Sequence, residues 1–120
     1  MKLQNEMFTV VSETAGEVCV RLHADHFIYQ AHFPGNPITP GVCIVQMICE
    51  ILQNRLGRPL SLAKIVNLKF VSVINPIENH EITIKFGCVV SDENECKAKG
   101  VIEANGCVKT KFSLLFVNKE

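Results

Sequence analysis

The sequence has no tryptophan, a single tyrosine and no excess charge of either sign. Twelve basic residues balance twelve acidic ones, whereas a nucleic-acid-binding domain is expected to carry a basic excess. No apolar run approaches the roughly 18 residues that a spanning helix needs, and the polar, charged first six residues are unlike a secretory signal. We therefore expect a cytoplasmic protein with no membrane insertion and no nucleic-acid partner.

The six cysteines include no Cys-x-x-Cys pair, and their gaps match neither zinc-ribbon nor redox spacings. In a cytoplasmic protein this pattern indicates buried, reduced thiols and no metal site. Hydrophobic residues make up 48% of the chain and charged residues 20%, which is an ordinary globular composition. We expect one domain spanning residues 1–120.

The middle of the chain is typical of a buried helix. Residues 42–56 lack proline and glycine and are apolar around most of the helical circumference, so this helix needs cover on several sides. It is expected to end at Gly57, beside the basic residues Arg55 and Arg58.

Strand patterns lie on both sides of this helix, and residues 23–31 are expected to form a loop or one short helix. The pair Asn105-Gly106 between two alternating runs favours a tight hairpin. Strands are expected at residues 8–12, 17–22, 63–73, 81–90, 95–103 and 108–117. This inventory predicts an α+β domain in which a curved antiparallel sheet wraps one long central helix.

A stiff loop precedes the helix. Residues 32–41 hold three prolines and two glycines, which excludes a regular element. The first amides of a helix lack intrahelical partners and lie at its positive end, so they can stabilise an oxygen that gains negative charge. Gly41 lets another molecule approach its amide closely, and His32 titrates near neutral pH and could move a proton beside that oxygen.

The run from His32 to Val42 resembles the signature loop of the FabZ and FabA type 3-hydroxyacyl-[acyl carrier protein] dehydratases, which have the hot-dog fold. Lys69-Phe70 followed by Pro76 resembles the family's strand after the helix, and residues 99–106 resemble its last hairpin. The resemblance therefore extends from the first strand to the C-terminus.

This resemblance implies a chemistry and its residues. His32 corresponds to the histidine that removes the α-proton of a (3R)-hydroxyacyl thioester, and Gly41 to the amide donor for the thioester oxygen. Phe33, Pro40 and Val42 fall in the substrate-binding part of the same loop. The resemblance further implies an acyl carrier protein or coenzyme A thioester as substrate, a homodimer or an assembly of dimers, a role in fatty-acid or related biosynthesis, and no cofactor.

One position departs from the family pattern. The carboxylic acid that helps the β-hydroxyl to leave falls fourteen residues after the histidine, where this chain has Gln46. Glu50 stands where the FabZ branch usually has glutamine, one helical turn further along the same face. Two hypotheses stay open: Glu50 replaces the acid and Gln46 orients the substrate or a water molecule, or the exchange has removed dehydration. The second hypothesis leaves an acyl thioesterase, or a non-catalytic acyl-binding or dimer-partner subunit.

Overall fold

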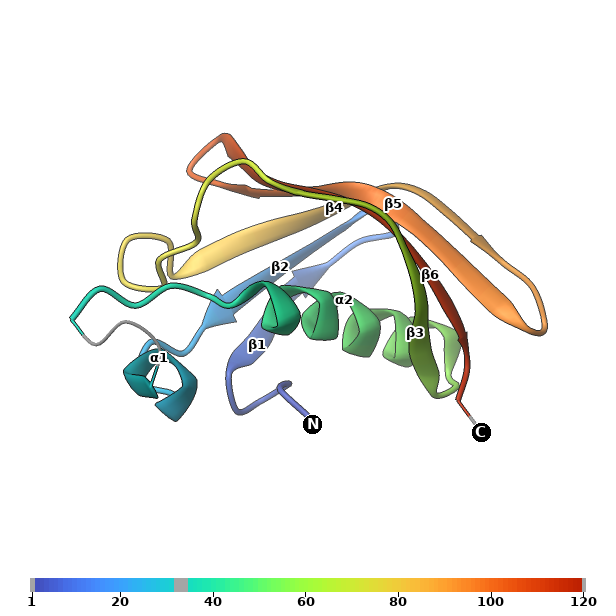
Figure 1. Cartoon of the computed structure of the whole chain (residues 1–120), viewed down its shortest axis with the longest axis horizontal. Helices are drawn as coiled ribbons and strands as arrows, with labels where there is room; N and C mark the ends of the chain where they lie inside the picture. Colours follow the sequence, from blue (N-terminus) through green and yellow to red (C-terminus); the bar gives the residue numbers. More distant parts are fainter. Residues whose placement is uncertain (1, 32–34, 120) are drawn as a thin grey trace.

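A computed structural model describes residues 2–31 and 35–119 (Figure 1). One long helix, α2, lies beneath a strongly curved sheet. The elements follow in the order β1 (Phe8–Glu13), β2 (Glu17–Leu22), α1 (Phe27–Ala31), α2 (Gly41–Leu56), β3 (Leu60–Phe70), β4 (Glu81–Ser91), β5 (Glu95–Ala104) and β6 (Cys107–Asn118). The predicted α+β domain with a wrapped central helix is confirmed.

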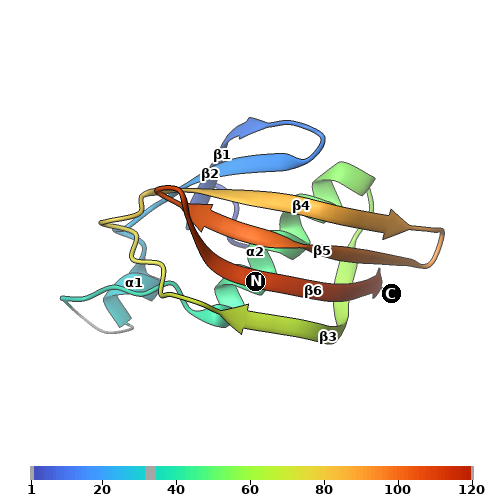
Figure 2. The ribbon, with the colours of Figure 1, turned by 90° about the horizontal axis from the view of Figure 1, so that it is seen from above.

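The six strands form one antiparallel sheet in the order β1-β2-β4-β5-β6-β3. Figure 2 looks onto the outer face of this sheet, with α2 behind it. The inward residues of the strands and most of α2 form one hydrophobic core. Strand β3 is at the sheet's edge, so one of its two sides has no strand partner among the described residues.

Helix α2 is buried on most sides, as its apolar circumference predicts. It begins directly after Pro40, whose carbonyl oxygen accepts hydrogen bonds from the amides of Cys43 and Ile44 at 3.0 and 3.1 Å. It ends at Gly57, which has a φ of 68° and donates its amide to the Gln53 carbonyl at 2.9 Å. The left-handed conformation at Gly57 is the reason that glycine follows the last turn.

The hairpin between β5 and β6 is also as predicted. Asn105 and Gly106 have φ values of 53° and 77°. Two successive residues with positive φ are what a two-residue hairpin turn of type I′ requires, and asparagine and glycine tolerate that conformation best.

The prediction for β3 is wrong at both ends, because the strand spans Leu60–Phe70 and not residues 63–73. The strand ends at Phe70 because the next two amides, of Val71 and Ser72, both donate to the carbonyl of Lys109. Phe70 and Thr110 are therefore the last pair of the β3–β6 ladder, although β6 itself extends to Cys107. The β-branched Val71 and Val73 made the sequence look extended beyond the last pair of this ladder.

No helix within residues 2–31 and 35–119 is long and apolar enough to cross a membrane.

Candidate functional site

The loop before α2 carries most of the predicted site residues. His32 and Phe33 lie outside the described residues. Pro40 is the residue before the first turn of α2, with φ and ψ of −63° and 145°. Gly41 is half-buried in that turn, whereas Val42 is 69% exposed. The amides of Gly41 and Val42 make no hydrogen bond with any residue that the structure describes, so both donors are available to a ligand.

The ring of Phe70 covers Gly41. A Cβ atom built on Gly41 would lie 2.6 Å from Cζ of Phe70 and 3.1 Å from Cε2. Any side chain at position 41 would therefore displace the ring. Phe70 itself is 51% exposed, so it forms a movable wall rather than a fixed part of the core.

An apolar cavity of about 310 Å³ lies beside this first turn. Gly41, Pro40 and Phe70 are part of its wall, and Ile38, Ile44 and the segment 72–74 complete most of the rest. The Gly41 amide, which makes no hydrogen bond with a described residue, is thus next to a space that an apolar group can occupy.

A hydrogen bond between Tyr29 and Thr39 closes the base of the loop. The two hydroxyl oxygens are 2.9 Å apart, and both side chains are buried. Burial raises the pKa of Tyr29 to about 12, although the Thr39 hydrogen bond acts in the opposite direction. Thr39 also donates its amide to the Ile74 carbonyl at 2.8 Å. These contacts fix α1 and the start of α2 relative to the sheet.

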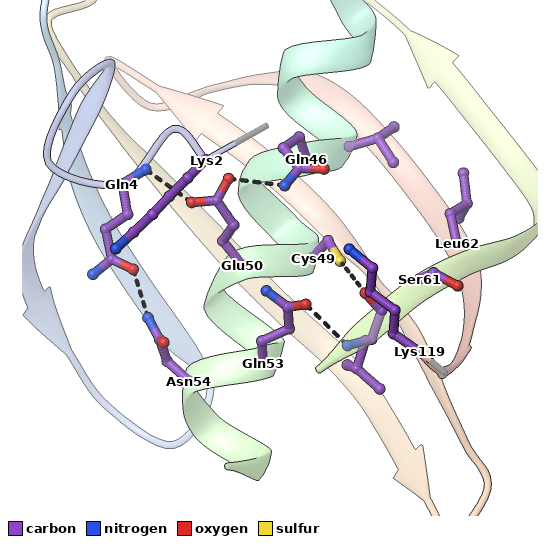
Figure 3. A pocket seen from close by; sticks show the side chains of 12 residues that line it. Lys2, Gln4, Gln46, Cys49, Glu50, Gln53, Asn54, Ser61, Leu62 and Lys119 are labelled. Atoms are coloured by element: carbon purple, nitrogen blue, oxygen red, sulfur yellow. Dashed lines mark hydrogen bonds between the residues drawn. The ribbon is translucent and has the colours of Figure 1, made fainter. Parts of the chain in front are cut away.

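Gln46 and Glu50, two of the polar residues of α2, contact each other. The amide nitrogen Nε2 of Gln46 donates to Oε2 of Glu50 at 2.9 Å. Glu50 is only 5% exposed, and its carboxylate also accepts three hydrogen bonds from the N-terminal segment, of which Figure 3 draws the one from Gln4. The amide of Leu3 donates to Oε1 at 3.0 Å and to Oε2 at 2.8 Å, and the amide of Gln4 donates to Oε1 at 2.8 Å. All the donors are N–H groups, so both oxygens act as acceptors.

A second cavity, of about 360 Å³, opens beside Gln46 and Glu50. It has no lining residue in common with the cavity at Gly41. Gln46 follows Gly41 by five residues, which corresponds to roughly 140° around a helix. Within one chain, the Gly41 amide and the Gln46–Glu50 pair therefore face different spaces, and the structure does not bring these two halves of the predicted site together.

The buried cysteines of α2 have packing roles. Burial raises the pKa of the Cys43 thiol. Burial and the nearby Glu50 raise the pKa of the Cys49 thiol, against a smaller opposite effect of Lys119. Cys49 Sγ is 3.5 Å from the Leu60 carbonyl oxygen. A thiol with a raised pKa is a weak nucleophile at neutral pH.

His23 and His26, which lie before the loop, are engaged in local contacts. His23 lies 2.7 Å from the Thr9 hydroxyl and 2.8 Å from the Glu6 carbonyl oxygen. Nδ1 of His26 accepts from the Ile28 amide at 3.2 Å. Within the described part of the chain, no group of three or more His, Cys, Asp or Glu side chains could hold a metal ion.

Sequence reasoning did not find the contacts of Glu50 with Leu3 and Gln4, because 47 and 46 residues separate the partners and the donors are backbone amides. Nor did it find the cover of Gly41 by Phe70. A small residue in the first turn, next to Pro40, was the available signal that something approaches this backbone closely.

The architecture is that of the hot-dog fold. A hypothetical thioesterase from Streptococcus pneumoniae with coenzyme A superposes with a TM-score of 0.65 at 16% identity, covering 93% of this chain and 85% of that chain. The dehydratase heterocomplex ApeI:P from Xenorhabdus doucetiae superposes with a TM-score of 0.62 at 16% identity, covering 92% and 98%. At this identity the similarity shows the fold.

Two relatives in sequence are 3-hydroxyacyl-[acyl-carrier-protein] dehydratases FabZ. That of Fusobacterium nucleatum is 30% identical over 94 residues, covering 74% of this chain and 65% of the relative. That of Caldanaerobacter subterraneus is 30% identical over 104 residues, covering 77% and 69%. The chain thus spans about two thirds of the length of these relatives.

Residues 9–106 match the family described as ApeI-like, ApeI dehydratase. This match includes the loop, α2 and five strands in full or in part. The chain therefore belongs to the ApeI-like family of FabZ-type hot-dog dehydratases.

Proposed function

We propose that the chain dehydrates (3R)-hydroxyacyl thioesters to trans-2-enoyl thioesters in fatty-acid or related biosynthesis, with an acyl carrier protein or coenzyme A as the thiol. The observation that carries this proposal is the pair of unpartnered amides at Gly41 and Val42, which begins a buried helix beside an apolar cavity. Such amides stabilise the negative charge that develops on the thioester oxygen when the α-proton leaves.

Each predicted residue has a role in this proposal. His32 removes the α-proton, and the amides of Gly41 and Val42 hold the thioester oxygen. Phe33 and Pro40 contact the substrate next to that oxygen. The pair Gln46 and Glu50 acts on the β-hydroxyl: Glu50 supplies its proton, and Gln46 orients the leaving group. The C–H bond at the α-carbon and the C–O bond at the β-carbon break, a C=C bond forms, and water leaves with the proton from Glu50; no cofactor is needed.

The contacts of Glu50 set a condition on its role. A protonated carboxyl group has one oxygen that carries hydrogen and points it at an acceptor, so that oxygen cannot keep all of its N–H donors. Glu50 must therefore release part of its contact with Leu3 and Gln4 before it donates a proton. The donors from the N-terminal segment are backbone amides, so their release requires that segment to move.

We further propose a homodimer in which each site combines the loop of one subunit with the Gln46–Glu50 pair of the other. Two facts support it: the separate cavities around Gly41 and Glu50, and the unpaired edge of β3. Large apolar residues gather on this strand and just after it, each at least 41% exposed: Leu62, Ile65, Val66, Phe70, Val71 and Val73. Burial of such a patch against a second copy removes apolar surface from water.

A second candidate function is favoured because both carboxylate oxygens of Glu50 already accept hydrogen bonds within the chain. Here the chain contributes His32 and the Gly41 amide, while a different hot-dog subunit supplies the acid that position 46 lacks. The ApeI:P dehydratase of Xenorhabdus doucetiae is a heterocomplex, which is the arrangement that this candidate requires.

The deciding experiment is an assay of the purified chain with crotonyl and 3-hydroxybutyryl thioesters. Interconversion of the two by the chain alone supports the first candidate. Activity that appears only with an added acid-bearing subunit supports the second. Release of free thiol without interconversion would contradict both and indicate a thioesterase.

A further inference from the structure

The cavity beside Glu50 is lined mainly by polar side chains from four separate parts of the chain: the N-terminal segment, α2, β3 and the C-terminal end (Figure 3). Besides Gln46 and Glu50, its polar wall consists of Lys2, Gln4, Gln53, Asn54, Ser61 and Lys119. A cavity meant for an alkyl chain is lined predominantly by apolar groups. The composition of this wall therefore indicates a polar ligand.

Hydrogen bonds within the chain use up most of the acceptors in this wall. Both oxygens of Glu50 accept from N–H groups. Oε1 of Gln53 accepts from the backbone amide of Leu60 at 2.9 Å, which fixes the orientation of that side chain because the Leu60 amide can only donate. Oε1 of Gln4 accepts from Nδ2 of Asn54 at 2.5 Å.

The groups left for a ligand are mainly donors. They are the NH₂ groups of Gln4 and Gln53, the ammonium groups of Lys2 and Lys119, and the hydroxyl of Ser61, which can also accept; the side-chain carbonyl oxygen of Asn54 is a further acceptor. Neither lysine forms an ion pair with a residue that the structure describes. The opposing charge of Glu50 is covered by its own donors and is 5% exposed.

We propose that this cavity binds an anionic, acceptor-rich group, a phosphate or a carboxylate, held by Lys2, Lys119 and the Gln53 amide. Its volume of about 360 Å³ accommodates such a group together with the chain that carries it. The assignment of this anion to the thioester substrate rests on the proposed function. The anion is then either a phosphate of the thiol carrier or a carboxylate at the end of the acyl chain.

The test is a titration of the full chain with three probes by calorimetry. Coenzyme A carries phosphates, succinyl-pantetheine carries a carboxylate and no phosphate, and crotonyl-pantetheine carries neither. The variant Lys2→Gln/Lys119→Gln removes both charges. Lys99→Gln/Lys111→Gln is the matched control, because these exposed lysines lie on β5 and β6 and do not line this cavity. Gln53→Glu keeps the acceptor for Leu60 and replaces the NH₂ donor with a carboxylate oxygen.

We expect one or both anionic probes to bind wild-type protein, and the Lys2→Gln/Lys119→Gln variant to bind at least ~10-fold more weakly, as for the loss of a charge-assisted hydrogen bond. Gln53→Glu should weaken binding to a similar degree, and the control should keep wild-type affinity. Preferred binding of coenzyme A assigns the site to a phosphate, and preferred binding of succinyl-pantetheine assigns it to a carboxylate.

The proposal is overturned if neither anionic probe binds, if the Lys2→Gln/Lys119→Gln variant keeps wild-type affinity, or if the control loses as much affinity as that variant. The outcome is independent of the catalytic proposal. Hydration of crotonyl-pantetheine tests catalysis without an anion on the substrate. If this reaction is absent, the binding result still stands. If the anion site is absent, this reaction should still occur.

Discussion

Gln46 donates its side-chain amide to the carboxylate of Glu50, at 2.9 Å and one turn further along α2. The same carboxylate holds the backbone amides of Leu3 and Gln4. The polar pair of the helix is thereby connected to the N-terminal segment, and a change at either residue affects both the candidate chemistry and the local fold. This connection is the basis for separating the roles of Glu50 by mutation.

Glu50→Gln should abolish most dehydratase activity if Glu50 is the acid. Loss of a general acid lowers the rate by about 10²–10⁴-fold. The variant also has one acceptor oxygen in place of two, so it should lose about 1–3 kcal/mol of unfolding free energy as buried amides go unpaired. Hydration of crotonyl-pantetheine, followed by absorbance, gives the first quantity and urea unfolding the second.

The matched control is Glu78→Gln, which removes an exposed carboxylate outside both cavities and should change neither quantity. Full activity of Glu50→Gln, together with the expected loss of stability, would show that Glu50 only anchors the N-terminal segment.

Gln46→Glu should raise activity. The new carboxyl group lies within hydrogen-bond distance of Glu50, and two carboxylates so close cannot both ionise at low cost, so one retains a proton near neutral pH. The pair then titrates as a unit. The alkaline limb of the pH profile of kcat/KM should lie at higher pH in the variant than in wild type, because the shared proton is held more tightly. A rate below wild type at every pH would count against a role of position 46 in proton transfer.

Several parts of this architecture could be predicted from sequence, and the reasons are local. Gly57 and the Asn105-Gly106 turn require positive φ, and the apolar circumference of residues 42–56 requires burial. The end of β3 could not be predicted, because it depends on pairing with β6, where the partner of Phe70 is Thr110, 40 residues away along the chain. The contacts of Glu50 could not be predicted either, because backbone amides leave no pattern in a sequence. His32 and Phe33 lie outside the described residues, so their roles stay predictions.

Gly41→Ala should lower activity at little cost in stability. The added Cβ would meet Cζ of Phe70 at 2.6 Å, and the half-exposed ring can swing away. The ring and the new methyl group then occupy the space that a thioester oxygen needs at the amide. We expect kcat/KM to fall by at least ~10-fold, with the unfolding free energy changed by less than about 1 kcal/mol.

The double variant Gly41→Ala/Phe70→Ala isolates the effect of the ring. Because it removes the displaced group, it should recover part of the activity, and the two substitutions should be non-additive. Additive losses would mean that the ring does not obstruct the amide.

Tyr29 should limit stability at alkaline pH. Burial raises its pKa to about 12 from an ordinary value of 10.0, so the folded state favours the neutral phenol. The stabilisation is fully present below pH 10 and is lost as the pH rises from 10 towards 12, because the unfolded chain gives up the proton first. Urea midpoints measured between these pH values should fall less in Tyr29→Phe than in wild type. Parallel declines in the two proteins would show that another group controls this range.

Ile65→Lys should dissociate the proposed dimer. Ile65 is 48% exposed on β3, and burial of a lysine ammonium at a strand-to-strand contact is unfavourable. Ile77→Lys is the matched control, since Ile77 is 65% exposed in the segment between β3 and β4, away from the edge strand. Light scattering after gel filtration should give a dimer for wild type and for the control, and a monomer for Ile65→Lys. Since the Gly41 amide and the Gln46–Glu50 pair face different cavities of one chain, the monomer should also be inactive on crotonyl-pantetheine. An active monomer would show that both halves of the site belong to a single chain.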